Sequence, residues 1–419
     1  MRRMKSSGID WIGNIPDEWK TTKIKYLFEI SSGSTPAADD QYWDGEVRWI
    51  TPADFKTKDK YVSGGKRNIS SMGYASCSTS MVPVNSIIFS KRAPIGTVVI
   101  NTEELCTNQG CLTCIPQRDL VVDYFYYVLS IGTEHFELLG SGTTFKEISA
   151  NNFASSAIPM PTYDEQKKIA DFLDRKRVEI DETYSTIQAQ IDLLEQSKRS
   201  VITETVTKGL TRDVKLKDSG IQWIGMTPSH WDCIRGKYIL KYVQKPVRDD
   251  DGIITCFRDG EVTLRSNRRE EGFTMADKEI GYQGIDVGDL VVHGMDGFAG
   301  SIGISDSRGK ASPVLNVLET DQNKRYIMYF LRSMAYSDVF LALATGIRVR
   351  SCDLRWNKLA ELFYPVPPLE EQNAIVEHID AVIQKTNEVI AQKKEQLAVL
   401  DEYKKSLIYE YVTGKKEVV

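Results

Sequence analysis

The 419-residue sequence lacks the motifs by which most nucleotide-using enzymes hold their substrates. It has no GxxxxGKS/T loop, which excludes a P-loop ATPase, and no Asn-Pro-Pro-aromatic or Asp-Pro-Pro-Tyr run typical of amino-methyltransferases. A glycine-rich nucleotide fingerprint is missing as well. The four histidines are scattered and have no nucleophile at a readable spacing, so acid–base catalysis is not indicated. The sequence therefore predicts a binding protein without catalytic residues or a cofactor of its own.

Long apolar runs are also missing. The longest, such as residues 339–344, fall far short of the roughly 18 residues that a membrane span needs. The basic residues near the N-terminus have no apolar stretch behind them, so a secretory signal is not expected. Seven cysteines in a chain of this size are typical of reduced thiols. We therefore expect a cytoplasmic protein without a membrane partner.

Three of the cysteines, Cys106, Cys111 and Cys114, end in a CxxC spacing that raises the alternative of a zinc site. A second pair of ligands is missing nearby, and residues 107–110 between them are typical of a strand and a turn. The sequence therefore favours buried structural thiols over a metal site.

An internal repeat organises the chain. Residues 7–13 (SGIDWIG) return as residues 219–225 (SGIQWIG), an offset of 212, and two further blocks return in the same order at an offset of 206. One module of about 206–212 residues is therefore used twice. Because the SGI-WIG block follows the first long helix but precedes the first insert, the arrangement is circular. Residues 7–19 are thus expected near the end of the second helix, around Thr413.

Two long helices are predicted, the first from Thr162 to Lys208 and ended by Gly209, the second in the corresponding repeat and ended by Gly414. Apolar residues recur every seven positions along both, which indicates a coiled coil in which each helix is the nearest partner of the other. Packing of each helix on some other core is the alternative. The predicted seam comprises Leu173, Ile180, Ile187, Ile191, Leu194 and Val201 in the first helix and Ile379, Ile383, Ile390, Leu397, Leu400 and Leu407 in the second.

Between the repeated blocks lie two divergent inserts, residues 20–158 (first insert) and 232–364 (second insert). Short β-rich runs, such as residues 86–90 and 289–293, precede an apolar helical stretch in each insert. The fold class expected is mixed α/β (α+β). The expected domains are 1–158 including an N-terminal segment 1–19, a helix over 159–213, a second globular domain over 214–364, and a helix over 365–419.

The net charge of −5 would ordinarily argue against a nucleic-acid partner. The acidity, however, lies mainly in the helical stretches. The first insert has 13 basic and 14 acidic residues, and the second has 19 of each. Near-neutral inserts can still gather cations on one face.

Basic side chains cluster in both inserts, with aromatic residues between them. Arginine prevails in the second cluster, and its planar fork can take guanine O6 and N7 together or grip a phosphate. For any one residue, an ordinary solvated surface is the alternative. The candidates for DNA binding are Lys56, Lys58, Lys66, Arg67, Lys91 and Arg92 in the first insert, beside which Lys60 lies, and Arg248, Arg258, Arg265, Arg268, Arg269, Arg348, Arg350 and Arg355 in the second.

The sequence resembles the specificity subunits of type I restriction–modification enzymes. The resemblance covers nearly the whole chain. It rests on residues 32–36 (SGSTP), 42–43 (YW), 49–50 (WI), 91–96 (KRAPIG) and 108–110 (NQG), and on the Pro-x-Pro…Glu-Gln helix entries at Pro159 and Pro365. The second insert has no counterpart of the SGSTP and NQG runs. It keeps only residues 288–291 and 300–303 in comparable places.

This resemblance implies two target-recognition domains separated by two antiparallel helices in a pseudo-two-fold repeat, each domain reading half of a split DNA site. It also implies two methyltransferase and two restriction subunits as partners. Those partners would use S-adenosylmethionine, ATP and magnesium, while this chain would hold no cofactor. The alternative function is a coiled-coil scaffold whose inserts bind proteins instead of DNA.

Overall fold

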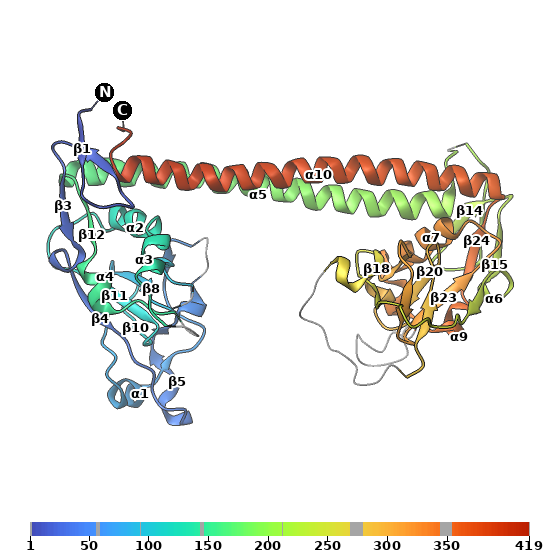
Figure 1. The fold of residues 1–419 in the computed structure, drawn as a ribbon, viewed down its shortest axis with the longest axis horizontal. Coiled ribbons are helices and arrows are strands. Elements are labelled where there is room, and N and C mark those ends of the chain that lie inside the picture. Colours follow the sequence, from blue (N-terminus) through green and yellow to red (C-terminus); the bar gives the residue numbers. More distant parts are fainter. Residues whose placement is uncertain are drawn as a thin grey trace. The chain divides into compact units, whose positions relative to one another are not determined.

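The computed structural model describes residues 2–55, 59–92, 94–142, 146–211, 213–268, 280–343 and 354–418. The chain divides into two units (Figure 1). Unit 1 comprises residues 1–186 and 395–419, and unit 2 comprises residues 187–394. Each unit contains one insert together with part of both long helices. Both units mix helices and strands, which confirms the predicted fold class.

A five-stranded sheet forms the centre of unit 1 (Figure 1). Its strand order is β4 (Phe28–Ser32), β11 (Cys111–Pro116), β8 (Ile87–Ser90), β9 (Val98–Asn101) and β7 (Tyr61–Val62). All neighbours are antiparallel except β7 and β9, which are parallel. The predicted strand at 86–90 and the helical stretch at 122–139, observed as α2 (Val122–Ser130) and α3 (Thr133–Leu138), are confirmed.

Unit 2 repeats this sheet. Its order is β16 (Lys241–Val243), β23 (Leu315–Glu319), β20 (Leu290–His293) and β21 (Ile302–Ile304), all antiparallel. Helix α7 (Lys324–Tyr336) follows β23 as α2 follows β11. The two inserts therefore share a four-stranded sheet although most of their side chains differ. Among the described residues of unit 2, no strand takes the place of β7.

Pairs of short strands repeat outside the sheets. In unit 1 they are β1 (Met4–Ser6) with β2 (Asn14–Pro16), and β3 (Lys20–Lys23) with β12 (Ala157–Met160). In unit 2 they are β13 (Leu216–Asp218) with β14 (Met226–Pro228), and β15 (Asp232–Arg235) with β24 (Phe363–Val366). These pairs come from the repeated sequence blocks and lead the chain into and out of each insert.

The two long helices are α5 (Tyr163–Lys208) of 46 residues and α10 (Leu369–Val412) of 44 residues. Gly209, just after α5, has a φ of +76°, a left-handed conformation that glycine adopts without strain. In unit 1, Lys404 on α10 bonds Asp181 on α5 over 2.6 Å. In unit 2, Lys198 on α5 donates to Asn387 on α10 over 3.0 Å, and Lys393 on α10 donates to Gln190 on α5 over 2.6 Å. Rising numbers on one helix meet falling numbers on the other within unit 2, so the helices are antiparallel there.

None of the twelve predicted seam residues is exposed. The buried members are Leu173, Ile180, Ile191, Ile379, Ile390, Leu397 and Leu407, and the partly buried members are Ile187, Leu194, Val201, Ile383 and Leu400. At its ends the seam merges with the cores of the units. In unit 1, Leu173, Ile180 and Leu407 belong to the same cluster as the core of the first insert. The ends of the helices thus pack on the inserts as well as on each other.

The N-terminal segment lies against the end of α10 within unit 1, as the circular repeat predicts. The Tyr409 hydroxyl donates to the carbonyl of Ile12 over 3.0 Å. A Cβ atom on Gly414 would lie 2.5 Å from Pro16 and 3.0 Å from Trp19, so only glycine fits there without movement.

The thiols of Cys106, Cys111 and Cys114 are buried in three different hydrophobic clusters. Cys111 and Cys114 are three residues apart on β11, and side chains at that separation point to opposite faces of a strand. The two sulfur atoms therefore face different clusters and do not converge on one point. Burial raises the pKa of Cys106 to about 11. Among the described residues, no helix is both long and apolar enough to cross a membrane.

Candidate nucleic-acid interface

Nine of the fourteen candidate cations lie among the described residues. Lys56, Lys58, Arg269, Arg348 and Arg350 lie outside them. The described candidates are Lys66, Arg67, Lys91 and Arg92 in unit 1 and Arg248, Arg258, Arg265, Arg268 and Arg355 in unit 2. Several of them are bonded to carboxylates of the same insert, which the sequence did not predict.

Lys91 and Arg92 share one carboxylate, that of Glu147. The Lys91 ammonium lies 2.9 Å from Glu147, and the Arg92 Nε lies 2.8 Å from it. Burial alone would raise the pKa of Glu147, but the hydrogen bonds from Lys91 and Arg92 lower it. At neutral pH the two cations of the KRAPIG run and Glu147 together carry one net positive charge.

Arg67 is fixed between a carboxylate and an indole ring. Its Nε and Nη2 donate to the two oxygens of Asp44, each over 3.0 Å, and its guanidinium lies 4.4 Å from the centroid of the Trp43 ring. The hydrogen bond from Arg67 lowers the pKa of Asp44. The Arg67 side chain remains 48% exposed. It is thus oriented, charged and open to solvent.

The SGSTP run holds the aromatic part of this arrangement. Trp43 opens β5 (Trp43–Val47), and its indole N–H donates to the Ala37 carbonyl over 2.9 Å. Its ring packs edge-to-face on Trp49, with 5.2 Å between centroids. Trp49 in turn donates to the Ser34 carbonyl over 3.1 Å. Both tryptophans are therefore fixed by the backbone of residues 34–37.

The NQG run packs directly against the SGSTP run. A Cβ on Gly33 would lie 1.8 Å from the Thr107 carbonyl oxygen, so the close approach of the two backbones requires glycine. The Thr35 hydroxyl donates to Gln109. These two of the motifs that carry the resemblance thus form one support for Trp49, Trp43 and Arg67.

The second insert places Arg268 in a comparable setting without those motifs. The hairpin of β17 (Ile254–Cys256) and β18 (Val262–Leu264) carries the parts. The Arg268 Nη1 lies 2.8 Å from Asp259 and 3.1 Å from Glu261, and the guanidinium lies 4.2 Å from the centroid of the Phe257 ring. The Arg268 side chain is 35% exposed.

The other described candidates are held differently. Arg258 pairs with Asp296 over 3.1 Å. The Arg265 Nε donates to the Thr255 hydroxyl over 3.2 Å. Arg355 precedes the short helix α9 (Trp356–Leu359), and the backbone N–H of Arg248 donates to the Asp251 carboxylate over 2.8 Å. Lys66 is exposed, and its backbone N–H donates to Asp54 over 3.0 Å.

Lys60, which lies beside the basic cluster of the first insert in the sequence, is buried in the structure. Lys60 is 2% exposed, and its ammonium pairs with Asp123 over 2.6 Å and with Asp174 of α5. The ring centroid of Tyr127 lies 4.8 Å from this ammonium. Lys60 therefore joins the first insert to α5 in unit 1. The local sequence around Lys60 does not indicate that it is buried, because its partners Asp123 and Asp174 lie 63 and 114 residues away.

Comparison with known proteins shows what this chain is similar to. Residues 16–193 match the family model described as type I restriction modification DNA specificity domain. The chain is 39% identical over 166 residues to the type I restriction enzyme MjaIX specificity subunit of Methanocaldococcus jannaschii, which covers 39% of this chain and 38% of that protein. It is 25% identical over 216 residues to the EcoR124I/EcoR124II specificity subunit of Escherichia coli, covering 49% and 46%. Both matches span less than half of the relative.

A longer match links the chain to the putative MjaX specificity subunit of Methanocaldococcus jannaschii, at 22% identity over 97% of this chain and 96% of that protein. Two solved structures share the fold. One, from a study of type I R-M complex assembly, has a TM-score of 0.68 at 14% identity and covers 95% of this chain and 98% of its own. The HsdS subunit of Thermoanaerobacter tengcongensis has a TM-score of 0.51 at 13% identity, with 96% and 98% covered. Residues 16–193 thus match the type I restriction modification DNA specificity domain, and nearly the whole chain is similar to specificity subunits of type I restriction enzymes.

Proposed function

We propose that this chain is the DNA sequence-recognition subunit of a type I restriction–modification complex, in which each insert reads one half of a split site. One observation carries the proposal most directly. The two inserts share a four-stranded sheet but present different loops, each with a stacked arginine. A common frame with divergent polar loops suits two readers of different base sequences.

The helices suit the role of a spacer. A helix of 46 residues is about 70 Å long, and one turn of B-DNA measures about 34 Å. We infer that the helix pair sets the gap between the two half-sites. The antiparallel pairing within a repeated chain also supports docking by a symmetric pair of methyltransferase subunits.

Catalysis is assigned to partner subunits. We propose that two methyltransferase and two restriction subunits assemble with this chain and use S-adenosylmethionine, ATP and magnesium, while this chain supplies recognition alone. The missing phosphate-loop and methyltransferase motifs of the sequence support this division of labour.

Co-expression with the methyltransferase subunit, followed by single-molecule sequencing of methylated adenines, tests the proposal. We expect a split motif with a fixed gap. A complex that assembles but methylates no DNA would contradict it.

The rival function is a coiled-coil scaffold whose inserts bind proteins. Phosphate contacts predict an affinity for duplex DNA that falls steeply with salt. A scaffold predicts no such binding by the assembled complex, so titration with duplex DNA at several salt concentrations separates the two.

A further inference from the structure

We propose that Arg67 and Arg268 each recognise one guanine, Arg67 in the half-site read by the first insert and Arg268 in the half-site read by the second. The inference rests on the proposed DNA-reading function and makes it specific. It follows from an arrangement that both inserts have built from unrelated sequence.

In both inserts a guanidinium lies over an aromatic ring and is held by carboxylate. The ring centroid is 4.4 Å from Arg67 and 4.2 Å from Arg268. The ring below restricts the position of the guanidinium, and the carboxylate bonds restrict its rotation. Each arginine is therefore oriented before a ligand arrives, which lowers the entropy lost on binding.

The carboxylates occupy only part of each fork. The Asp44 carboxylate accepts hydrogen bonds from Nε and Nη2 of Arg67. The remaining pair of donors, on Nη1 and the second Nη2 hydrogen, points away from Asp44. Asp259 and Glu261 both approach Nη1 of Arg268, so its Nε–Nη2 side is directed away from them. Each arginine thus keeps a pair of parallel donors, which is what guanine O6 and N7 accept in the major groove.

The acidic neighbours favour a base over a phosphate. A phosphate bound to Arg67 would approach the charged Asp44, and one bound to Arg268 would approach two carboxylates. Like charges at such distances repel, whereas the O6 and N7 acceptors of guanine are neutral. These arginines are therefore better suited to reading a base edge than to gripping the backbone.

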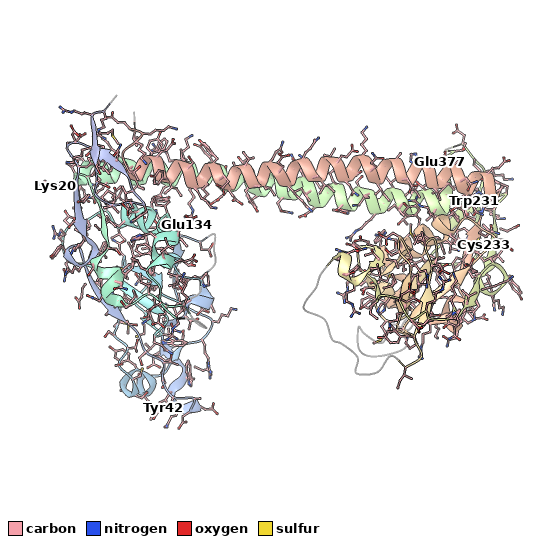
Figure 2. The ribbon with its side chains drawn as sticks, in the orientation of Figure 1. Lys20, Tyr42, Glu134, Trp231, Cys233 and Glu377 are labelled. Carbon is pink, nitrogen blue, oxygen red and sulfur yellow. The ribbon has the colours of Figure 1, made fainter. Side chains whose placement is uncertain are left out.

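Trp43, the ring over which Arg67 lies in the first insert, is held in place and is positioned to contact DNA. Trp43 is bonded to the Ala37 carbonyl and packed on Trp49, as described above. Tyr42, the residue before Trp43, lies at the end of unit 1 remote from α5 and α10 (Figure 2). The stack is thus presented at a tip of unit 1.

Conservative variants of the assembled methyltransferase complex test the proposal. The wild-type methylation motif is determined first, and Arg67→Lys and Arg268→Lys are then compared with it, with Arg3→Lys as a control at a highly exposed ion pair. Lysine keeps the charge but loses the two-donor fork. We expect each variant to lose about 5- to 150-fold of its discrimination at one guanine of one half-site, with the other half-site unchanged.

A second measurement identifies the contacted atom. Replacing that guanine by 7-deazaguanine removes the N7 acceptor, so it should weaken the wild-type complex but leave the matching lysine variant unaffected. Suppose instead that an alanine variant binds all DNA sequences equally more weakly and that lysine at the same position restores this binding. That result would indicate phosphate contact and overturn the inference. A half-site without guanine would overturn it too. In both cases the proposed function would stand, whereas a complex that recognises no DNA would overturn that function.

Discussion

The indole N–H of Trp19 donates to the Glu165 carboxylate over 3.1 Å, across 146 residues of sequence. Trp231 makes the same bond to Glu371 over 3.0 Å in the second unit. Each carboxylate lies in the first turn of a long helix, where negative charge is favourable. The bond therefore ties the strand leading into each insert to the start of the helix that leaves it.

Glu165→Ala should destabilise the protein by about 1–2 kcal/mol at pH 7, because it removes the partner of both Trp19 and Arg2 at a partly exposed site. Burial raises the pKa of Glu165, but hydrogen bonds from Arg2 and Trp19 lower it below its ordinary value. Its contribution should thus be complete above the unfolded pKa, about 4.3, and be lost as the pH falls through the lower folded pKa. Urea unfolding measures both effects. Glu182→Ala, an exposed position on the same helix, should change little.

Lys60→Met should cost about 2–4 kcal/mol, since it leaves the Asp123 and Asp174 carboxylates without their common cation. Burial alone would raise the pKa of Asp123, but hydrogen bonds from Lys60 and Tyr61 lower it. The wild type should therefore lose this stabilisation only as the pH falls below about 4, through the folded pKa. Denaturant unfolding from pH 3 to 7 measures the difference. Lys66→Met, at an exposed lysine of the same insert, is the control, and an equal loss in both variants would contradict the role given to Lys60.

Leu173→Ala should destabilise the protein by about 2–5 kcal/mol, because Leu173 is 1% exposed in the core shared by α5 and the first insert. Leu193→Ala is a matched control on the same helix, since Leu193 is 63% exposed. The control should stay within about 0.5 kcal/mol of the wild type. Thermal and urea unfolding compare the three proteins. Similar losses in the two variants would mean that the seam is assigned to the wrong face.

Glu147→Gln should strengthen non-sequence-specific binding of the assembled complex to duplex DNA. The substitution removes the negative charge shared by Lys91 and Arg92, so one more positive charge is available to phosphate. The slope of the logarithm of the binding constant against the logarithm of salt should steepen by about one. Fluorescence anisotropy at several salt concentrations measures it. An unchanged slope would place the KRAPIG run away from the DNA backbone.

The repeat, the two helices and one strand of each insert, at residues 86–90 and 289–293, could be predicted because they depend on local pattern. A heptad recurs wherever a helix buries one stripe, and Gly209 and Gly414 mark where the helices stop. The equivalence of the two sheets could not be predicted, since a pleated surface accepts many apolar side chains. In the sequence, only residues 288–291 and 300–303 indicated that parts of the two inserts correspond.

The candidate interface could be predicted only as a set of cations. Which carboxylate holds which cation depends on residues distant in sequence, as with Arg92 and Glu147, 55 positions apart. Lys60 shows the same limit, because a lysine in a polar stretch gives no sign that three tyrosines surround it. The stacking of Arg67 on Trp43 likewise depends on tertiary structure.

The contact of the Tyr124 hydroxyl with the Val412 carbonyl has a genetic consequence. Residues 395–419 belong to unit 1, whose core they help to close. A nonsense codon near position 395 would therefore uncover the first insert, which lies far upstream in the sequence, while the second insert would keep its own contact, from Tyr326 to Val206. Late truncations should consequently expose protease-sensitive sites in the first insert before the second.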